Sequence, residues 1–225
     1  MENRAAYDEL AEAYSRTFDP DGTGLRDPVF ERLLGDVTCQ RVLALACGQG
    51  QDARLLAALG AQVVGVDLSG RMLAHARDLE RRVPRGIRYV QGDAEELSDF
   101  ADESFDGVAC HMALMDVARL EPTIVSTARV LRAGGWFVLS IVHPCYRPHV
   151  EIVSDYLGDV RYERKLPNDA LPGHAYHRPI GAYVNALVRA GFAIGELVEV
   201  HHVAGGAAGD IPGLLYLRCV KLSAQ

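Results

Sequence analysis

Residues 41–50 read Arg41-Val42-Leu43-Ala44-Leu45-Ala46-Cys47-Gly48-Gln49-Gly50, an apolar run of strand length that enters a turn with two glycines. A helical pattern follows from Asp52, and a second apolar run, residues 61–66, ends on the carboxylate of Asp67. Glycine lets the backbone approach a ligand closely, and a helix that follows it presents free N–H groups. An acid at the tip of the second strand can accept hydrogen bonds from a ribose diol. This order of features predicts a nucleotide-type site.

Taken alone, the pattern Gly48-x-Gly50-x-x-Ala53 also fits the dinucleotide fingerprint of NAD enzymes. Further motifs follow in order along the chain: Val66-Asp67-Leu68-Ser69 with Met72-Leu73, then Gly92-Asp93-Ala94, then Ser104-Phe105-Asp106-Gly107-Val108, then Arg129-Val130-Leu131-Arg132-Ala133-Gly134-Gly135. Together with the glycine turn, this ordered set resembles the class I S-adenosylmethionine (SAM) dependent methyltransferases. The resemblance runs from about residue 7 to residue 140.

Strand and helix patterns alternate along the chain, which favours a parallel sheet with helices on both faces. Strands are expected near 41–46, 62–67, 87–91, 105–110, 135–142, 193–200 and 214–221, and helices near 29–34, 52–59, 70–82, 120–132 and 179–190. The resemblance implies a Rossmann-like α/β fold with a seven-stranded, mostly parallel sheet whose last strand is antiparallel. A length of 225 residues suits one domain over residues 1–225.

Two segments of the expected domain lie outside the alternating pattern. Residues 3–16 form an amphipathic helix, and Tyr7-Asp8-x-x-Ala11-x-x-Tyr14 within it resembles the helix that lies over the cofactor in many small-molecule methyltransferases. Alternatively, these tyrosines only pack a cap helix. Residues 143–178 combine prolines, tyrosines and histidines with little periodicity, so we expect an insertion that serves as a substrate lid.

Charge and cysteine usage narrow the possible partners. A net charge of −7 argues against nucleic acid, which normally requires a basic surface. No apolar run approaches membrane-spanning length, and the start of the chain is not a signal pattern, so a cytoplasmic protein without a membrane partner is expected. The five cysteines are scattered and lack a C-x-x-C pair, which indicates reduced thiols. We expect a monomer or homodimer.

The resemblance implies SAM as cofactor and assigns residues to its parts. The backbone of Ala46, Cys47, Gly48 and Gly50 would pass the methionine half, and Asp67 would hold both ribose hydroxyls. The remaining expected contacts are Leu68 and Met72 to the adenine, Asp93 and Ala94 to its amino edge, Tyr14 from the N-terminal helix, and His111. For Asp93 the alternative is a helix N-cap.

Two positions depart from the family pattern. The family usually has an acid where this chain has Ala44, and a glycine where it has Ala46. The first change removes a member of the network behind the methionine amino group. We expect the second to be milder, provided that the backbone at Ala46 does not need a positive φ.

Two histidines are the candidate catalytic residues. His111 and His143 follow neighbouring strands, where the methyl group is expected, and imidazole is the commonest general base. A histidine satisfied by a backbone partner is the alternative for either one. Sets such as His143-x-Cys145 with His149, or His174-x-x-His177, lack a second matching pair, so no metal site is expected.

The sequence also indicates the class of acceptor and of reaction. The Asn/Asp-Pro-Pro-aromatic run expected of nucleic-acid or protein-amide methyltransferases is absent after residue 110, and the polar aromatic rings of residues 143–178 suit an aromatic or polycyclic small molecule. The leading hypothesis is O- or N-methylation of such an acceptor. The alternatives are a SAM-fold protein that steers a non-methylating reaction, and an NAD-dependent oxidoreductase.

Overall fold

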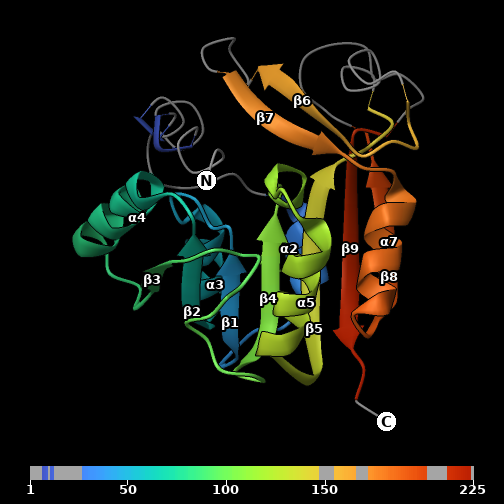
Figure 1. Ribbon diagram of the computed structural model, residues 1–225. Helices are drawn as coiled ribbons and strands as arrows, with labels where there is room; N and C mark the ends of the chain where they lie inside the picture. The colour runs from blue at the N-terminus through green and yellow to red at the C-terminus, as the bar shows by residue number, and fades with distance from the viewer. Residues whose placement is uncertain are drawn as a thin grey trace.

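The computed structural model describes residues 7–9, 11–12, 27–146, 155–165, 172–201 and 212–223. A seven-stranded sheet with the order β3-β2-β1-β4-β5-β9-β8 forms its centre (Figure 1). The strands of this sheet are β1 Arg41–Leu45, β2 Gln62–Asp67, β3 Arg88–Gln91, β4 Phe105–His111, β5 Leu131–Val142, β8 Phe192–Val200 and β9 Leu214–Lys221. A separate two-stranded sheet consists of β6 Val160–Lys165 and β7 Pro172–His177.

The direction of the strands confirms the expected Rossmann-like class. Strands β1 to β5 pair in parallel, whereas β9 pairs antiparallel with both β5 and β8. The strand order reverses beside β1, which pairs with β2 on one side and β4 on the other. In open α/β sheets a ligand crevice forms at such a point, outside the carboxyl ends of the strands.

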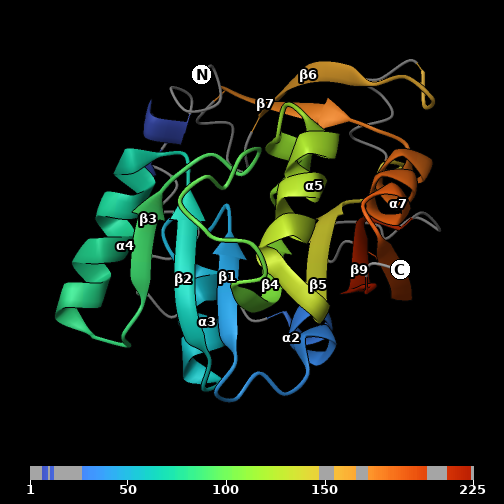
Figure 2. The same ribbon diagram turned by 60° about the horizontal axis from the view of Figure 1, so that its bottom comes forward.

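Helices cover both faces of the sheet (Figure 2). They are α2 Pro28–Leu34, α3 Gln51–Ala58, α4 Gly70–Arg82, α5 Leu120–Val130 and α7 Ile180–Arg189, with the short 3₁₀ helix η1 at Leu114–Asp116. Side chains alternate along a strand, so Val42 and Ala44 pack in the core against α2, α3 and α4. Leu43 and Leu45 pack in the opposite core against α5 and α7.

Most expected elements are present, with small shifts at their ends. The strand expected at 214–221 is β9, whereas the helix expected at 120–132 ends at Val130 because the chain continues directly into β5. Pro179 is the N-cap residue of α7 rather than its first helical residue. Of the helix expected over residues 3–16, the described residues 7–9 and 11–12 are helical.

The segment 143–178 contains regular structure that its sequence did not predict. Strands β6 and β7 pair antiparallel, from Val160 opposite His177 to Lys165 opposite Pro172. This hairpin lies above the carboxyl ends of the parallel strands (Figure 1). Among the described helices, none has both the length and the apolar character needed to cross a membrane.

Candidate functional site

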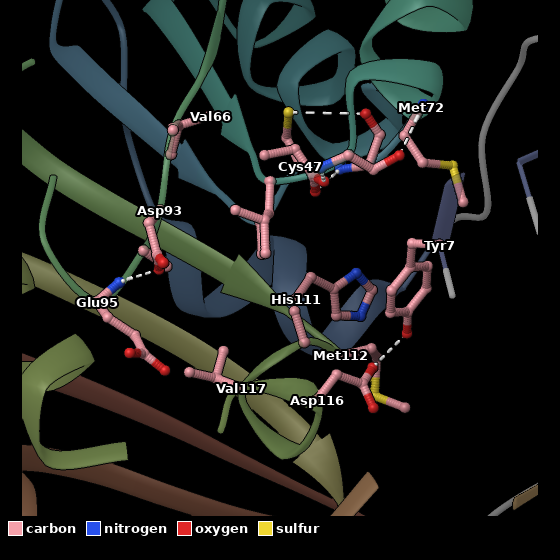
Figure 3. Close-up of a pocket in the computed structure, with 18 of the residues that line it drawn as sticks. Tyr7, Cys47, Val66, Met72, Asp93, Glu95, His111, Met112, Asp116 and Val117 are labelled. Carbon is pink, nitrogen blue, oxygen red and sulfur yellow. Dashed lines mark hydrogen bonds between the residues drawn. The ribbon is translucent and has the colours of Figure 1, made fainter. Parts of the chain in front are cut away.

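A cavity of about 500 Å³ opens at the carboxyl edge of the sheet. Figure 3 shows Val66, Asp93 and Glu95 at one end of it and the rings of Tyr7 and His111 at the other. The expected cofactor residues that line it are Ala46, Cys47, Gly48, Asp67, Leu68, Met72, Asp93, Ala94 and His111. Gly50 is not among the lining residues, and Tyr14 lies outside the described residues.

The two glycines after β1 have different tasks. Both have positive φ, +53° at Gly48 and +88° at Gly50. A side-chain carbon on Gly48 would meet no atom within 4 Å, so the cavity beside it is open to a ligand. The same carbon on Gly50 would lie 2.3 Å from the hydroxyl oxygen of Tyr89. Gly50 is therefore needed for close packing and for the start of α3, rather than at the cavity wall.

The two departures at the end of β1 also differ. Ala44 is buried in the core that faces α3 and does not line the cavity. Ala46 has a φ of +52°, so the condition under which the change to alanine was expected to be mild is not met. A side chain in this conformation costs about 1–2 kcal/mol, because Cβ approaches the following carbonyl oxygen. The surrounding turn therefore holds Ala46 under strain.

Asp67 ends β2 and links the two loops that flank the cavity. Its Oδ2 accepts a hydrogen bond from the backbone N–H of Gly48 at 2.7 Å, and its Oδ1 accepts one from Ser69 at 2.8 Å. Burial raises the pKa of Asp67, and these two N–H groups oppose that shift. Each carboxylate oxygen has a second lone pair, so Asp67 can hold the glycine turn and still accept hydroxyl groups from a ligand.

The described part of the N-terminal helix docks beside Asp67. Asp8 accepts a hydrogen bond from the Ser69 hydroxyl at 2.6 Å and one from the Arg71 backbone at 3.1 Å. Tyr7 lines the cavity, and its hydroxyl donates to Asp116 at 2.7 Å. This helix therefore connects the start of α4 with the loop that follows β4, across the mouth of the cavity.

Asp93 forms a local turn and lines the cavity at the same time. Its Oδ1 accepts from the backbone N–H of Glu95 at 2.9 Å, and its backbone oxygen accepts from Leu97 at 2.9 Å. The residues that follow form turns rather than the helix expected in the alternative interpretation. Its Oδ2 has no hydrogen-bond partner within the described ranges, which leaves it available to a donor in the cavity.

His111 lies in the cavity wall between two carboxylates. Its Nδ1 is 3.0 Å from Asp52 and its Nε2 is 3.3 Å from Asp27, while its ring stacks on Phe30 at a centroid distance of 4.2 Å. Burial lowers the pKa of His111, but the two carboxylates outweigh it and raise that pKa to about 9. At neutral pH the ring is a cation that donates from both nitrogens. Such a ring would have to lose this proton before it could act as a general base, so the catalytic role expected of His111 stays a prediction that its two carboxylate partners do not favour.

His143 does not line the cavity. Its side chain is only 2% exposed, its Nδ1 accepts from the backbone N–H of Cys145 at 3.0 Å, and its Nε2 is 2.7 Å from Glu199 on β8. With Nδ1 as an acceptor, the ring hydrogen is on Nε2 and is donated to Glu199. A catalytic base at His143 stays a prediction, which these partners and the position of the ring outside the cavity do not support. The ring fastens the loop after β5 to β8.

The hairpin β6–β7 reaches the cavity through Tyr176. Arg178, which follows β7, is 3% exposed and donates to the backbone oxygens of Val117 at 3.0 Å and Ala118 at 2.8 Å. Its guanidinium also lies 4.9 Å from the ring centroid of Tyr176. The hairpin is therefore fixed to the loop after β4, and Tyr176 is held in the cavity wall beside that loop.

Several site residues were missed from sequence. Asp52 and Asp116 line the cavity, and Asp27 contacts His111. Tyr176 also lines the cavity, but it is one of the polar aromatic rings of residues 143–178 that were expected to suit the acceptor. Asp27 carried a recognisable signal, since an aspartate before a proline is typical of a helix N-terminus, but this pattern does not predict a contact with a histidine far along the chain.

Within the described ranges, no three His, Cys, Asp or Glu side chains are grouped as a metal site, and His149 lies outside those ranges.

The sequence is similar to those of known methyltransferases. Residues 43–139 match the model of a methyltransferase domain family. A demethylmenaquinone methyltransferase of Tropheryma whipplei (strain Twist) is 32% identical over 164 residues, which cover 68% of this chain and 66% of that protein. A ubiquinone biosynthesis O-methyltransferase of Alkalilimnicola ehrlichii is 31% identical over 139 residues, which cover 58% of this chain and 56% of that protein.

A solved structure agrees with these sequence matches. The crystal structure of an S-adenosylmethionine dependent methyltransferase from Mesorhizobium loti gives a TM-score of 0.68 at 26% identity, and it covers 86% of this chain and 96% of that chain. The present chain spans slightly less than two thirds of the length of the Tropheryma relative. From the matched domain, the relatives and the shared fold, we conclude that the chain belongs to the class I SAM-dependent methyltransferase family.

Proposed function

We propose that this protein is a SAM-dependent methyltransferase that acts on a small-molecule acceptor. The observation that carries the proposal is the cavity wall formed by Gly48 and Asp67. There, a glycine with open space beside it is hydrogen-bonded to a carboxylate that retains acceptor capacity. This pair suits a ligand with a close backbone contact and a ribose diol. Bound SAM would supply a methyl group on a positively charged sulfur.

The protein's own residues divide between the two ends of the cavity. Leu68, Met72, Asp93 and Ala94 would hold the adenine, and Asp67 the ribose. The end lined by Tyr7, Met112 and Tyr176 would receive the acceptor. Methyl transfer requires mainly that the reacting atoms are aligned and that water is excluded. The volume of about 500 Å³ lies within the ordinary range for small-molecule sites.

The acceptor that we propose is a hydroxylated aromatic ring, such as a quinone precursor. The two relatives described above are named for methylation in menaquinone and ubiquinone chemistry. Tyr7 and Tyr176 offer amphipathic rings at the acceptor end of the cavity. His143 does not line the cavity and His111 is held between two carboxylates, which favours an acceptor whose hydroxyl group is already ionised.

We extend the proposal to the lid, the cellular location and the assembly of the protein. The hairpin β6–β7 would act as the lid over the acceptor, because Arg178 and Tyr176 fix it beside the cavity. All five cysteines are unpaired, which supports a reducing, cytoplasmic location. We further propose one catalytic domain, functioning as a monomer or homodimer without a nucleic-acid partner.

A screen by mass tests the proposal. Purified protein is incubated with SAM and a panel of hydroxylated naphthalene and benzene derivatives, and the products are followed by mass spectrometry. Methyltransferase activity requires an acceptor heavier by one CH₂ and an equal amount of S-adenosylhomocysteine. An acceptor that is converted without S-adenosylhomocysteine would instead support the non-methylating alternative. Failure to bind SAM in calorimetry would refute the proposal altogether.

A further inference from the structure

We propose that Asp52 binds the positively charged amino group of the cofactor's methionine half. This inference rests on the proposed function, since it assigns a residue to one part of SAM. Asp52 lies in the first turn of α3, directly after the glycine turn. It lines the cavity, and its side chain is 24% exposed. A carboxylate at this place can reach a ligand beside Gly48 without leaving its own helix.

One oxygen of Asp52 is engaged and the other is not. Oδ1 accepts from His111 Nδ1 at 3.0 Å. Among the described residues, no hydrogen-bond partner contacts Oδ2. A carboxylate that faces a cavity with an unused oxygen is suited to a cationic donor, because hydrogen bonds between charged groups are stronger than neutral ones.

His111 carries one positive charge between the negatively charged Asp27 and Asp52, so these three side chains together have one excess negative charge. Asp27, on the other side of the imidazolium, is fully engaged. Its Oδ1 accepts from the backbone of Val29 and Phe30, and its Oδ2 accepts from Tyr216 at 2.7 Å and from His111. One cationic ring therefore stands between two carboxylates, and Asp27 already has its complement of donors. The excess charge of this group is at Asp52, on the cavity side.

The other carboxylates of the cavity have other partners or lie at its other end. Asp67 accepts from two backbone N–H groups and its remaining acceptor capacity is proposed for the ribose, and Glu95 binds Arg119 at 2.6 Å. Asp116 accepts from Tyr7. Asp93 also has an unused oxygen, but Figure 3 places it at the opposite end from His111. Asp52 is thus the carboxylate whose position beside the glycine turn and free oxygen match the methionine half.

Ala44 gives the inference a structural reason. The acid that the family usually has there is absent, and the Ala44 methyl group lies in the dry core on the α3 side of the sheet. Without a charge on β1, a cationic group beside the glycine turn needs its counter-charge from another element. Helix α3 supplies it from its first turn through Asp52.

The test compares ligands with and without the amino group. Dissociation constants for SAM, S-adenosylhomocysteine and 5′-methylthioadenosine are measured by calorimetry for the wild type and for Asp52→Asn. The third ligand keeps the adenosine and the sulfur but lacks the amino-acid part. We expect Asp52→Asn to weaken SAM and S-adenosylhomocysteine by about 10- to 100-fold, and to leave 5′-methylthioadenosine within about twofold.

Two further variants serve as controls. Asp78→Asn removes an exposed carboxylate on α4 and should leave all three affinities unchanged, which separates a local contact from the general loss of charge. Asp52→Glu keeps the charge and should restore most of the lost affinity. It also keeps the proposal testable if Asp52→Asn fails to fold.

Four outcomes would overturn the inference, and a fifth would overturn the proposed function alone. Equal weakening of all three ligands would mean that Asp52 supports the fold of the adenosine site, and unchanged SAM binding would remove Asp52 from the site. Weakening of SAM alone would assign Asp52 to the sulfonium instead of the amino group. If the wild type binds 5′-methylthioadenosine and SAM but transfers no methyl group to any acceptor, the proposed function fails while the inference on Asp52 stands. If the wild type binds no SAM, both fail.

Discussion

The tips of β1 and β2 and the tips of β4 and β5 share one edge of the sheet, yet the two halves of this edge behave differently. At β1 and β2, the turn residues Gly48 and Asp67 lie where the sequence places them and bond to each other. At β4 and β5, two histidines that looked equivalent have opposite orientations. His111 enters the cavity as a cation, and His143 turns away toward Glu199.

The difference shows what a strand tip does and does not determine. The backbone of a parallel sheet brings all the tips to one edge, so any function carried by backbone groups and short side chains follows from the strand positions. The direction of a long side chain depends on partners from distant parts of the sequence. Asp27 and Asp52 hold the His111 ring in the cavity wall, whereas Glu199 on β8 holds the His143 ring outside the cavity.

The largest effect is expected at Asp67. Asp67→Ala removes the acceptor for two ribose hydroxyls, so SAM binding should weaken by about 2–4 kcal/mol. Unlike Asp52→Asn, this change should weaken 5′-methylthioadenosine to the same degree, because the ribose is common to both ligands. Calorimetry with both ligands provides the measurement, and a thermal melt checks that the protein is folded. Affinity that survives the change would remove Asp67 from the ribose site.

The second effect concerns the charge on His111. Its folded pKa, about 9, lies above the ordinary value of 6.5. The stabilisation is therefore fully present below pH 6.5 and is lost as the pH rises through 9, with a total of the order of 3 kcal/mol. Urea unfolding of the wild type and His111→Gln at several pH values should show a stability gap that narrows between pH 6.5 and 9. The Asp27 carboxylate, whose pKa is lowered to about 2, titrates far below this window.

A gap that stays constant over this range would mean that His111 is not a cation in the folded protein. The base at the acceptor would then have to be reconsidered, because a neutral His111 could accept a proton.

His143 should behave in the opposite way, as a structural residue. His143→Asn disturbs two hydrogen bonds of a buried ring, so it should lower the free energy of unfolding by about 1–3 kcal/mol. SAM affinity should stay within about twofold of the wild type, because the ring does not line the cavity. Urea unfolding and calorimetry on the same samples separate the two effects. A variant of full stability with impaired turnover would return His143 to the catalytic candidates.

The sequence predicted the sheet well because its core strands are short apolar runs bounded by turn residues. The strand expected at 62–67 is β2, and the acid that ends it lines the cavity. The hairpin β6–β7 was not predicted, since its strands lie apart from the core sheet and show no apolar alternation. The ion network of His111 could not be predicted either, because its members are brought together from positions 59 and 84 residues away.

The smallest effect tests the strain at the end of β1. Ala46→Gly should relieve the left-handed backbone at φ +52°, which costs a side chain about 1–2 kcal/mol. Glycine also gains freedom in the unfolded chain, worth about 0.4–1 kcal/mol in the other direction. The net result should be a protein whose free energy of unfolding is higher by up to about 1.6 kcal/mol in urea unfolding. Ala44→Gly is the matched control, because the same change two residues earlier falls in a regular buried strand and should destabilise by about 1 kcal/mol. If both variants lose stability equally, the backbone at Ala46 is not strained, and the alanine there does not affect the geometry of the turn.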